Sequence, residues 1–291
     1  MGGTFIITLR EAFEAALLLG IVYTYLDKIG CRGESRYVTG GAVLGLVASL
    51  ALGVAVSVFS GPLVELGPDV VTAGVIFLAV GLLSWHTWWM QRHARSLRGQ
   101  LQARIDAANV GRRVWLVGLI AFTGVFREGS ETVLFLWGLV SQATAGLGWA
   151  SVGGGLLGVA TAAALRWGIF RGGRRVSLTG FFAVTTVVLL FLAAGLASAG
   201  VGRLQSLGLL PWASPVWDTS GLLDDQGGVG SFLSGLVGYR ARPSAYEVAA
   251  YLAYLAIMAV VLFGPTRHPA SRITGADATE RPVPSRSSRG G

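Results

Sequence analysis

The chain has 291 residues, of which 53% are hydrophobic and 13% are charged, and its mean hydropathy is +0.62. A soluble domain typically carries about 25% charged residues, so this composition excludes an ordinary soluble protein and indicates a membrane protein. The net charge of +8 does not indicate nucleic-acid binding, because the basic residues lie in short loops without interleaved aromatic residues. A single cysteine, Cys31, excludes a disulfide framework or a thiolate metal cluster within the chain.

Apolar blocks of about 20 residues recur along the chain, the length that a helix needs to cross a bilayer. We predict an all-α polytopic protein with seven spans. They cover residues 3–26, 37–59, 70–90, 114–140, 149–170, 178–201 and 246–264. The first block carries charged residues and has no basic leader or small-residue cleavage site, so we interpret it as a retained span and not as a signal peptide.

Basic residues predict the orientation, because loops rich in Arg and Lys stay in the cytoplasm. The loops after the first, third and fifth spans, together with the C-terminal tail, hold seventeen such residues, and the opposite side holds Arg203, Arg240 and Arg242. We therefore expect the N-terminus outside and the C-terminus inside, in the cytoplasmic (inner) membrane. Residues 202–245 form an outer segment whose short apolar stretch, 229–239, lies in the interface or re-enters the membrane. The tail, 265–291, is expected to be disordered.

One charged motif occurs twice. The first copy comprises Arg10, Glu11 and Glu14, and the second, which comprises Arg127, Glu128 and Glu131, lies 117 residues further along. The same offset relates residues 3–90 to 114–201, so the two units of three spans run in opposite senses and form an inverted repeat, the plan of many transporters. The seventh span completes a permease domain of residues 1–264. The Gly41 and Gly45 pair corresponds roughly to Gly154 and Gly158, and we expect both pairs to pack helices closely.

In each motif the arginine and both glutamates share one helical face. Charge on that face is costly in lipid, so we expect the two faces to turn toward each other or toward a hydrated path. The predicted metal ligands are Glu11, Glu14, Glu128 and Glu131, with Arg10 and Arg127 as counter-charges. Ligation by carboxylates alone favours a hard cation.

Other polar residues receive simpler interpretations. His86 is placed near the cytoplasmic end of its span, His93 in a loop and His268 in the tail, so no histidine cluster is expected. Trp85, Trp88 and Trp89 are interpreted as an interfacial belt. An outer acidic group could guide cations to the path by raising their local concentration; it comprises Asp218, Asp224 and Asp225, with Glu65, Asp69 and Glu247 as further outer acids.

The two motifs and the outer segment from Pro215 to Tyr239 resemble the oxidase-dependent iron permeases, the family that includes the fungal high-affinity iron permease and the bacterial EfeU permeases. The family motif reads Arg-Glu-Gly-Leu-Glu, and this chain differs only at its variable positions, with Ala12, Phe13 and Ser130. The resemblance implies iron import, with ferric ion supplied by an oxidase partner. It also implies separate bacterial partners, a periplasmic iron-binding protein and a haem peroxidase.

Three alternatives stay open at this point. The cargo could be another hard cation, manganese or magnesium, or the motifs could be ion pairs in a scaffold subunit that transports nothing. An intramembrane enzyme is disfavoured, because the chain has no His-Glu-x-x-His, Gly-x-Ser-x-Gly or clustered Asp-rich motif. Iron is expected as cargo, and no permanently bound cofactor is expected.

Overall fold

The computed structural model describes residues 1–28, 30, 32–66, 68–93, 115–141, 149–172, 178–225 and 227–263. These residues form eight α-helices, a 3-10 helix at Arg32–Glu34 and one isolated β-bridge between Pro215 and Ser244. The predicted all-helical class is confirmed for this part of the chain. The expectations for Cys31, for the loop holding Arg95 to Arg113 and for the tail lie outside the described residues.

Seven of the helices correspond to the predicted spans. They are α1 (Gly2–Lys28), α2 (Ser35–Leu66), α3 (Pro68–His93), α5 (Trp115–Val140), α6 (Trp149–Gly172), α7 (Leu178–Ser206) and α9 (Ala245–Phe263). The largest differences are at the ends of α2 and α7, which extend beyond the predicted 59 and 201. Pro68 begins α3 because proline needs no N–H partner in the first turn of a helix and its φ already suits one.

Four helices are long and apolar enough to cross a membrane by length and composition alone. Their apolar stretches are Ser35–Phe59 in α2, Val70–Gln91 in α3, Gly180–Ser206 in α7 and Ala245–Leu262 in α9. The α1 and α5 helices are of similar length, but each contains the three charges of its motif. The chain is thus a multi-pass membrane protein, and the count of seven spans stays a prediction.

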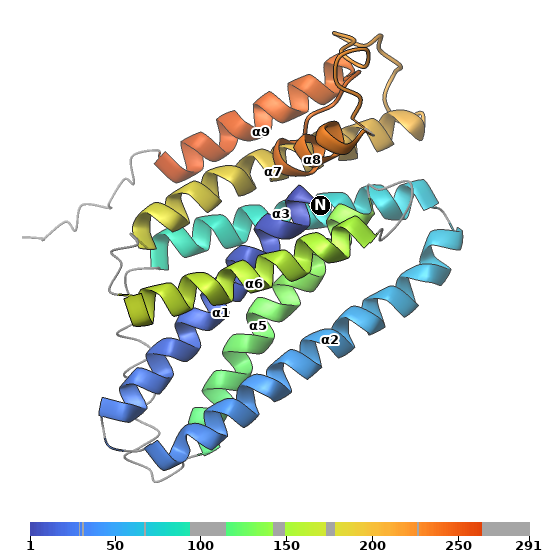
Figure 1. Ribbon diagram of the computed structural model, residues 1–291. Helices are drawn as coiled ribbons and strands as arrows, with labels where there is room; N and C mark the ends of the chain where they lie inside the picture. The colour runs from blue at the N-terminus through green and yellow to red at the C-terminus, as the bar shows by residue number, and fades with distance from the viewer. Residues whose placement is uncertain are drawn as a thin grey trace, which may run out of the picture.

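The helices form a bundle in which the two motif helices are central (Figure 1). At one edge α9 packs on α7, which packs on α3, and at the opposite edge α2 packs along α5. The α1 helix lies between α5 and α6 and contacts both. The motif helices are antiparallel: Gly3 near the start of α1 meets Leu139 at the end of α5, and Val22 near the end of α1 packs with Val117 near the start of α5.

Paired glycines allow the closest helix contacts, as predicted. A Cβ at Gly41 would overlap the carbonyl oxygen of Gly118 on α5, and one at Gly45 would lie 2.8 Å from the oxygen of Phe122. On the other side of the bundle, a Cβ at Gly154 or Gly158 of α6 would lie 2.6 or 2.7 Å from a backbone oxygen near the start of α1. The two oxygens belong to Met1, immediately before α1, and to Phe5 of α1, which are 117 positions before Gly118 and Phe122. The contact of α2 with α5 is therefore repeated as the contact of α6 with α1.

Substitutions at neighbouring glycines of α2 test this packing. Gly41→Ala is expected to lower stability by about 1–3 kcal/mol, because the added methyl forces two backbones apart. Gly40 has open space where its Cβ would be, so Gly40→Ala is the matched control and is expected to be neutral or stabilising by up to about 1 kcal/mol through helix propensity. Thermal unfolding of the purified protein measures both, and equal shifts would contradict the assigned contact.

The predicted short apolar stretch of the outer segment is a helix, α8 (Gly228–Val237), which ends at Gly238 with a φ of 70°. It packs against the start of α1 and against α7, where Gly238 meets Gly195 closely enough that neither position has room for a side chain. At about 1.5 Å of rise per residue, Gly195 lies roughly 16 Å from the Ser206 end of α7. The α8 helix therefore descends along α7 beside the first turns of α1.

The α9 helix begins with a capping box. Ser244 donates its backbone N–H to Oε2 of Glu247 at 2.8 Å, and its hydroxyl accepts the N–H of Glu247 at 3.3 Å. The other oxygen of Glu247 pairs with Nη1 of Arg240 at 2.9 Å. Glu247 is 5% exposed, so this acid is a helix-capping carboxylate enclosed by its partners.

Candidate metal site

Each motif presents its charges on one face because the residues are one and four positions apart on a helix. On α1, Arg10 and Glu11 are each 1% exposed and Glu14 is 8% exposed. Nε of Arg10 lies 3.0 Å from Oε1 of Glu14. On α5 the equivalent pair, Nε of Arg127 and Oε1 of Glu131, is also 3.0 Å apart. The motifs thus have matching internal ion pairs.

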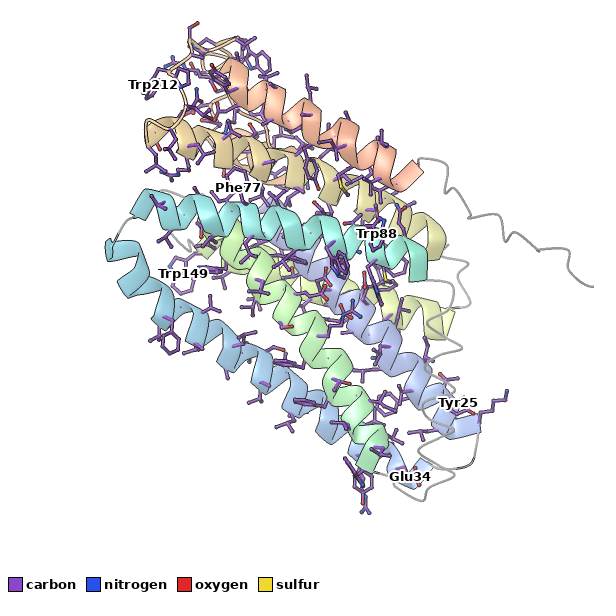
Figure 2. The ribbon with its side chains drawn as sticks, turned by 180° about the vertical axis from the view of Figure 1, so that it is seen from behind. Tyr25, Glu34, Phe77, Trp88, Trp149 and Trp212 are labelled. Atoms are coloured by element: carbon purple, nitrogen blue, oxygen red, sulfur yellow. The ribbon has the colours of Figure 1, made fainter. Side chains whose placement is uncertain are left out.

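The carboxylates of both motifs meet in the interior. Three carboxylate oxygens, one each from Glu11, Glu128 and Glu131, lie within 4.8 Å of one another. Glu11 also belongs to a second group of this kind, with Glu14 and His86. The predicted convergence of the two motifs is confirmed. Figure 2 shows the surrounding side chains, with oxygen and nitrogen atoms gathered in the middle of the bundle near Trp88. We call Glu11, Glu14, Glu128, Glu131 and His86 the central cluster.

Several oxygens of the central cluster lack hydrogen bonds. Both carboxylate oxygens of Glu11 and Oε2 of Glu128 are buried without one within the described residues, and Glu11 has only a long ion pair of 3.8 Å with Arg10. Buried polar atoms are usually hydrogen-bonded, and a buried carboxylate oxygen without a hydrogen bond is costly. A bound cation would satisfy these oxygens, so the donor set suits a metal ion as cargo.

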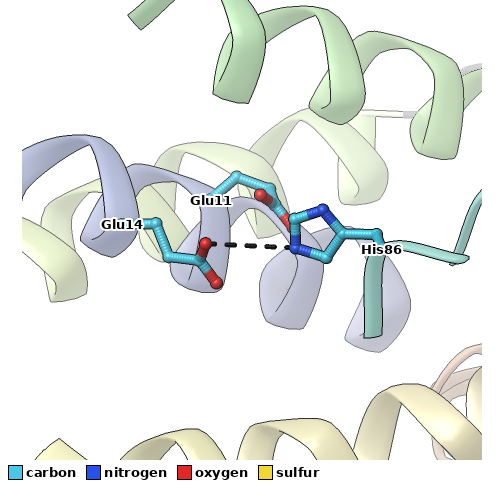
Figure 3. Close-up of side chains that lie close together, drawn as sticks. All are labelled: Glu11, Glu14 and His86. Atoms are coloured by element: carbon cyan, nitrogen blue, oxygen red, sulfur yellow. Dashed lines mark ion pairs between the residues drawn. The ribbon is translucent and has the colours of Figure 1, made fainter. Parts of the chain in front are cut away.

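His86 is the residue that the sequence analysis missed. Its ring, on α3, is 3% exposed and lies between the motifs: Nε2 is 3.9 Å from Oε2 of Glu14, and Nδ1 pairs with Oε2 of Glu131. Figure 3 shows Glu11 and Glu14 reaching toward this ring. An imidazole thus lies among the carboxylates, and the set of metal ligands stays a prediction. The available signal was an ionisable residue inside a predicted span, which by itself indicates a functional position.

The α3 helix also contacts the second arginine. The guanidinium carbon of Arg127 lies 4.3 Å from the ring centroid of Trp89, a cation–π contact. Trp89 is therefore more than an interfacial anchor, in contrast to the prediction. Trp85 is 62% exposed, and its ring is tilted by 39° to that of Trp88 with centroids 5.3 Å apart; the interfacial belt stays a prediction for these two residues.

The two arginines differ in exposure. The Arg10 side chain is 1% exposed and the Arg127 side chain is 42% exposed. The central cluster is therefore closed around Arg10 and more open around Arg127.

Comparisons with known proteins agree with this architecture. The profile of the iron permease FTR1 family matches residues 1–272, almost the whole chain. The chain belongs to this iron permease family. Ferrous iron permease EfeU of Escherichia coli O6:K15:H31 is 32% identical over 262 residues, covering 89% of this chain and 94% of that protein. Ferrous iron permease EfeU of Yersinia pestis is 31% identical over 269 residues, covering 91% and 94%.

The similarity extends to one protein described as inactive. The putative inactive ferrous iron permease EfeU of Escherichia coli K12 is likewise 32% identical over 262 residues. No solved structure matches the chain. Iron transport across a membrane is thus the activity of the family to which this permease belongs.

Apolar clusters enclose the central cluster of the permease on two sides. Along α1, Glu11 and Glu14 lie between Ile7 and Val22, each of which is fully buried. Ile7 belongs to a core with Leu83 of α3 and Phe135 of α5, and Val22 belongs to a separate core with Val117 and Ala121 of α5. An ion at the central cluster would therefore be separated from both membrane faces by packed apolar side chains.

Three of the acids that were predicted to lie outside, Asp218, Asp224 and Asp225, are in the segment before α8. Asp218 accepts hydrogen bonds from the hydroxyl and backbone N–H of Ser220 and pairs with Nε of Arg242 at 3.0 Å. These Ser220 hydrogen bonds and Arg242 lower the pKa of Asp218 to about 2. The hydrogen bond with Asp218 makes the largest contribution to raising the pKa of Arg242, and the negative charges of Asp224 and Asp225 make smaller ones. Three acids thus surround one arginine.

Proposed function

We propose that this permease imports iron across the cytoplasmic membrane through the central cluster. The observation that carries the proposal is the meeting of two Arg-Glu-x-x-Glu motifs, from different helices of an iron permease, at oxygens without hydrogen-bond partners. In a scaffold held together by ion pairs, each buried carboxylate would be expected to have a partner, whereas Oε2 of Glu128 is buried without a hydrogen bond within the described residues. Glu11, Glu14, Glu128 and Glu131 are the proposed ligands.

The proposed topology has seven spans, with the N-terminus outside and the C-terminus inside. Repeat one is 3–90 and repeat two is 114–201, followed by the outer segment 202–245, the last span 246–264 and a cytoplasmic tail 265–291. Support comes from the antiparallel motif helices and from the duplicated glycine contacts. The seventeen basic residues on one side support the orientation.

In this topology the two arginines lie at opposite ends of the path. Arg10 precedes its glutamates on α1, and Arg127 precedes its glutamates on the antiparallel α5. With His86 neutral, the four carboxylates and the two guanidinium groups sum to a net charge of about −2 when all are ionised, so a divalent ion neutralises the two motifs and a trivalent ion leaves them positive. The arginines thus weaken binding enough for a multivalent ion to be released.

Transport then requires the two apolar cores to open in turn. When the core around Ile7 separates, the central cluster faces outward, and when the core around Val22 and Val117 separates, it faces the cytoplasm. Rocking of one repeat against the other around a fixed site is the usual alternating-access motion. An inside-negative potential assists import by about 2.3 kcal/mol per charge for each 100 mV.

The transported iron could be in either of two oxidation states, ferric or ferrous. The family resemblance favours ferric ion delivered by an oxidase, with a periplasmic iron-binding protein and a haem peroxidase as partners. The names of the EfeU relatives describe ferrous iron. A ferrous cargo would need the reduced ion at the outer surface and no oxidation step.

Uptake into liposomes containing only the purified permease tests the proposal. With an inside-negative potential, we expect uptake of ferrous ion under reducing conditions, or of ferric ion held by a weak chelator, to exceed that of empty liposomes. Manganese and magnesium in excess should compete weakly. Equal uptake of manganese or magnesium would favour the other hard cations, and no uptake of any metal, alone or with partners, would overturn the transport role.

We also propose that the outer acids attract the ion. Replacing both Asp224 and Asp225 by asparagine removes two negative charges, whereas Asp218→Asn removes one, so the double replacement should have the larger effect. We expect a several-fold lower initial uptake rate at low ionic strength, and no difference at high salt, because attraction between exposed charges is screened within about 10 Å at 0.1 M. Asp218→Asn is the comparison. A rate loss that persists at high salt would point to a structural defect instead.

A further inference from the structure

We propose that His86 is a metal ligand of the central cluster and that it selects iron over manganese and magnesium. This inference rests on the proposed function, because it assigns a residue to the same ion site. It adds a third helix, α3, to a site otherwise built from the two repeated motifs.

The position of the imidazole carries the argument. A nitrogen of His86 and one oxygen each of Glu11 and Glu14 lie within 4.8 Å of one another, and its other nitrogen faces Glu131. The side chain is 3% exposed, and neither nitrogen makes a hydrogen bond of good geometry within the described residues. The ring of His86 therefore points from α3 into the space between the carboxylates.

The spacing suits a first-row metal. Such an ion sits about 2.0–2.2 Å from nitrogen or oxygen ligands, so ligands on opposite sides of it are about 4.2 Å apart. Atoms that are already within 4.8 Å of one another need only small side-chain rotations to close around the ion. The ring of Phe135 lies edge-on to His86 with centroids 6.1 Å apart, which restricts the plane of the imidazole.

Ligand chemistry then predicts selectivity. Carboxylates bind magnesium, calcium and manganese readily, whereas imidazole favours iron and the later transition metals. A site with Glu11, Glu14, Glu128 and Glu131 alone would discriminate poorly against magnesium and manganese. One nitrogen ligand shifts the preference toward iron. The remaining ligands are carboxylates, which can exchange, so the ion can still be released.

The competing role for His86 is structural, as an ion-paired link between α3 and the two motifs. A link would affect stability and the binding of all metals together. A ligand would change the ratio of affinities between metals. The two roles are therefore separated by measuring two metals on the same variant.

The test uses the purified full-length permease under anaerobic conditions, with ferrous ion and manganese as probes. In His86→Gln we expect the ferrous affinity to fall by about tenfold or more, with manganese affinity changing less than about threefold, so the ratio collapses. Ser84→Ala is the matched control, since Ser84 is a polar residue of α3 whose hydroxyl bonds Tyr254. It should leave the ratio unchanged. An unchanged ratio in His86→Gln would overturn the assignment.

A second measurement does not depend on any variant being folded. X-ray absorption of the iron-loaded wild-type protein should show the outer-shell scattering of one imidazole, and an all-oxygen spectrum would overturn the inference.

Glu128→Gln separates the two proposals. If it loses iron binding while His86→Gln keeps the wild-type ratio, the proposed function stands and only the role of His86 fails. If neither Glu128→Gln nor His86→Gln changes iron binding, both proposals fail.

Discussion

Glu11→Gln is expected to abolish iron uptake while leaving the fold intact. Glu11 belongs to both groups of potential ligand atoms, and it is 1% exposed with neither oxygen hydrogen-bonded. Glutamine keeps the volume and removes the charge, so the site loses its shared ligand. We expect uptake to fall by about 100-fold or more, the upper end of what disruption around a metal site costs. Thermal stability should change little, because glutamine removes a buried charge together with its long ion pair of 3.8 Å to Arg10.

The measurement is iron uptake into liposomes at equal protein density, together with the unfolding temperature of each sample. Glu34→Gln is the control for the charge change, since Glu34 lies in the short 3-10 helix before α2 and outside the central cluster. Wild-type uptake by Glu11→Gln would contradict the role of Glu11. A lower unfolding temperature together with lost uptake would instead indicate that Glu11 holds the helices together.

Much of the fold was predictable because a helix that crosses lipid needs a particular length and composition. A spanning helix must be about 20 residues long and apolar, so helix bounds follow from composition. The two motifs broke that rule at equivalent places, and the cost of charge in lipid required them to face each other. That expectation needed no knowledge of side-chain contacts, and the structure confirms it.

The contribution of α3 was harder to predict because it depends on tertiary geometry. His86 and Trp89 are three residues apart, so they share a face of α3, and that face meets Glu131 and Arg127. The α3 span carries no repeated motif, and its tryptophans match an interfacial belt equally well. Only the packing of α3 on α5 distinguishes the two interpretations. Glu247 shows the same limit, since its capping role depends on Ser244 and on the approach of Arg240.

The metal-binding roles of the glutamates and the oxidation state of the cargo stay predictions. Sequence pattern indicates which charges are buried, and structure indicates which meet. Whether an ion binds depends on the balance between desolvating it and neutralising the carboxylates, and that balance is a small difference of large terms.

Arg10→Gln is expected to destabilise the permease far more than Arg127→Gln. Arg10 is almost fully buried against Glu14, so its loss leaves a buried carboxylate without its counter-charge, which typically costs about 3–5 kcal/mol. Arg127 is 42% exposed and is also held by Trp89, so solvent compensates for its partner Glu131 when the guanidinium is removed. Arg127→Gln should therefore fold and show its defect in uptake instead.

A double substitution tests the physical reason. Adding Glu14→Gln to Arg10→Gln removes both members of the buried pair, so we expect the unfolding temperature to recover toward the wild-type value, while iron uptake stays absent because a ligand is gone. Adding Glu131→Gln to Arg127→Gln should restore much less of the unfolding temperature, since Arg127→Gln alone is expected to lower it less. Equal destabilisation by the two arginine substitutions, or no recovery in the double variant, would mean that the difference in burial between the motifs has no energetic consequence.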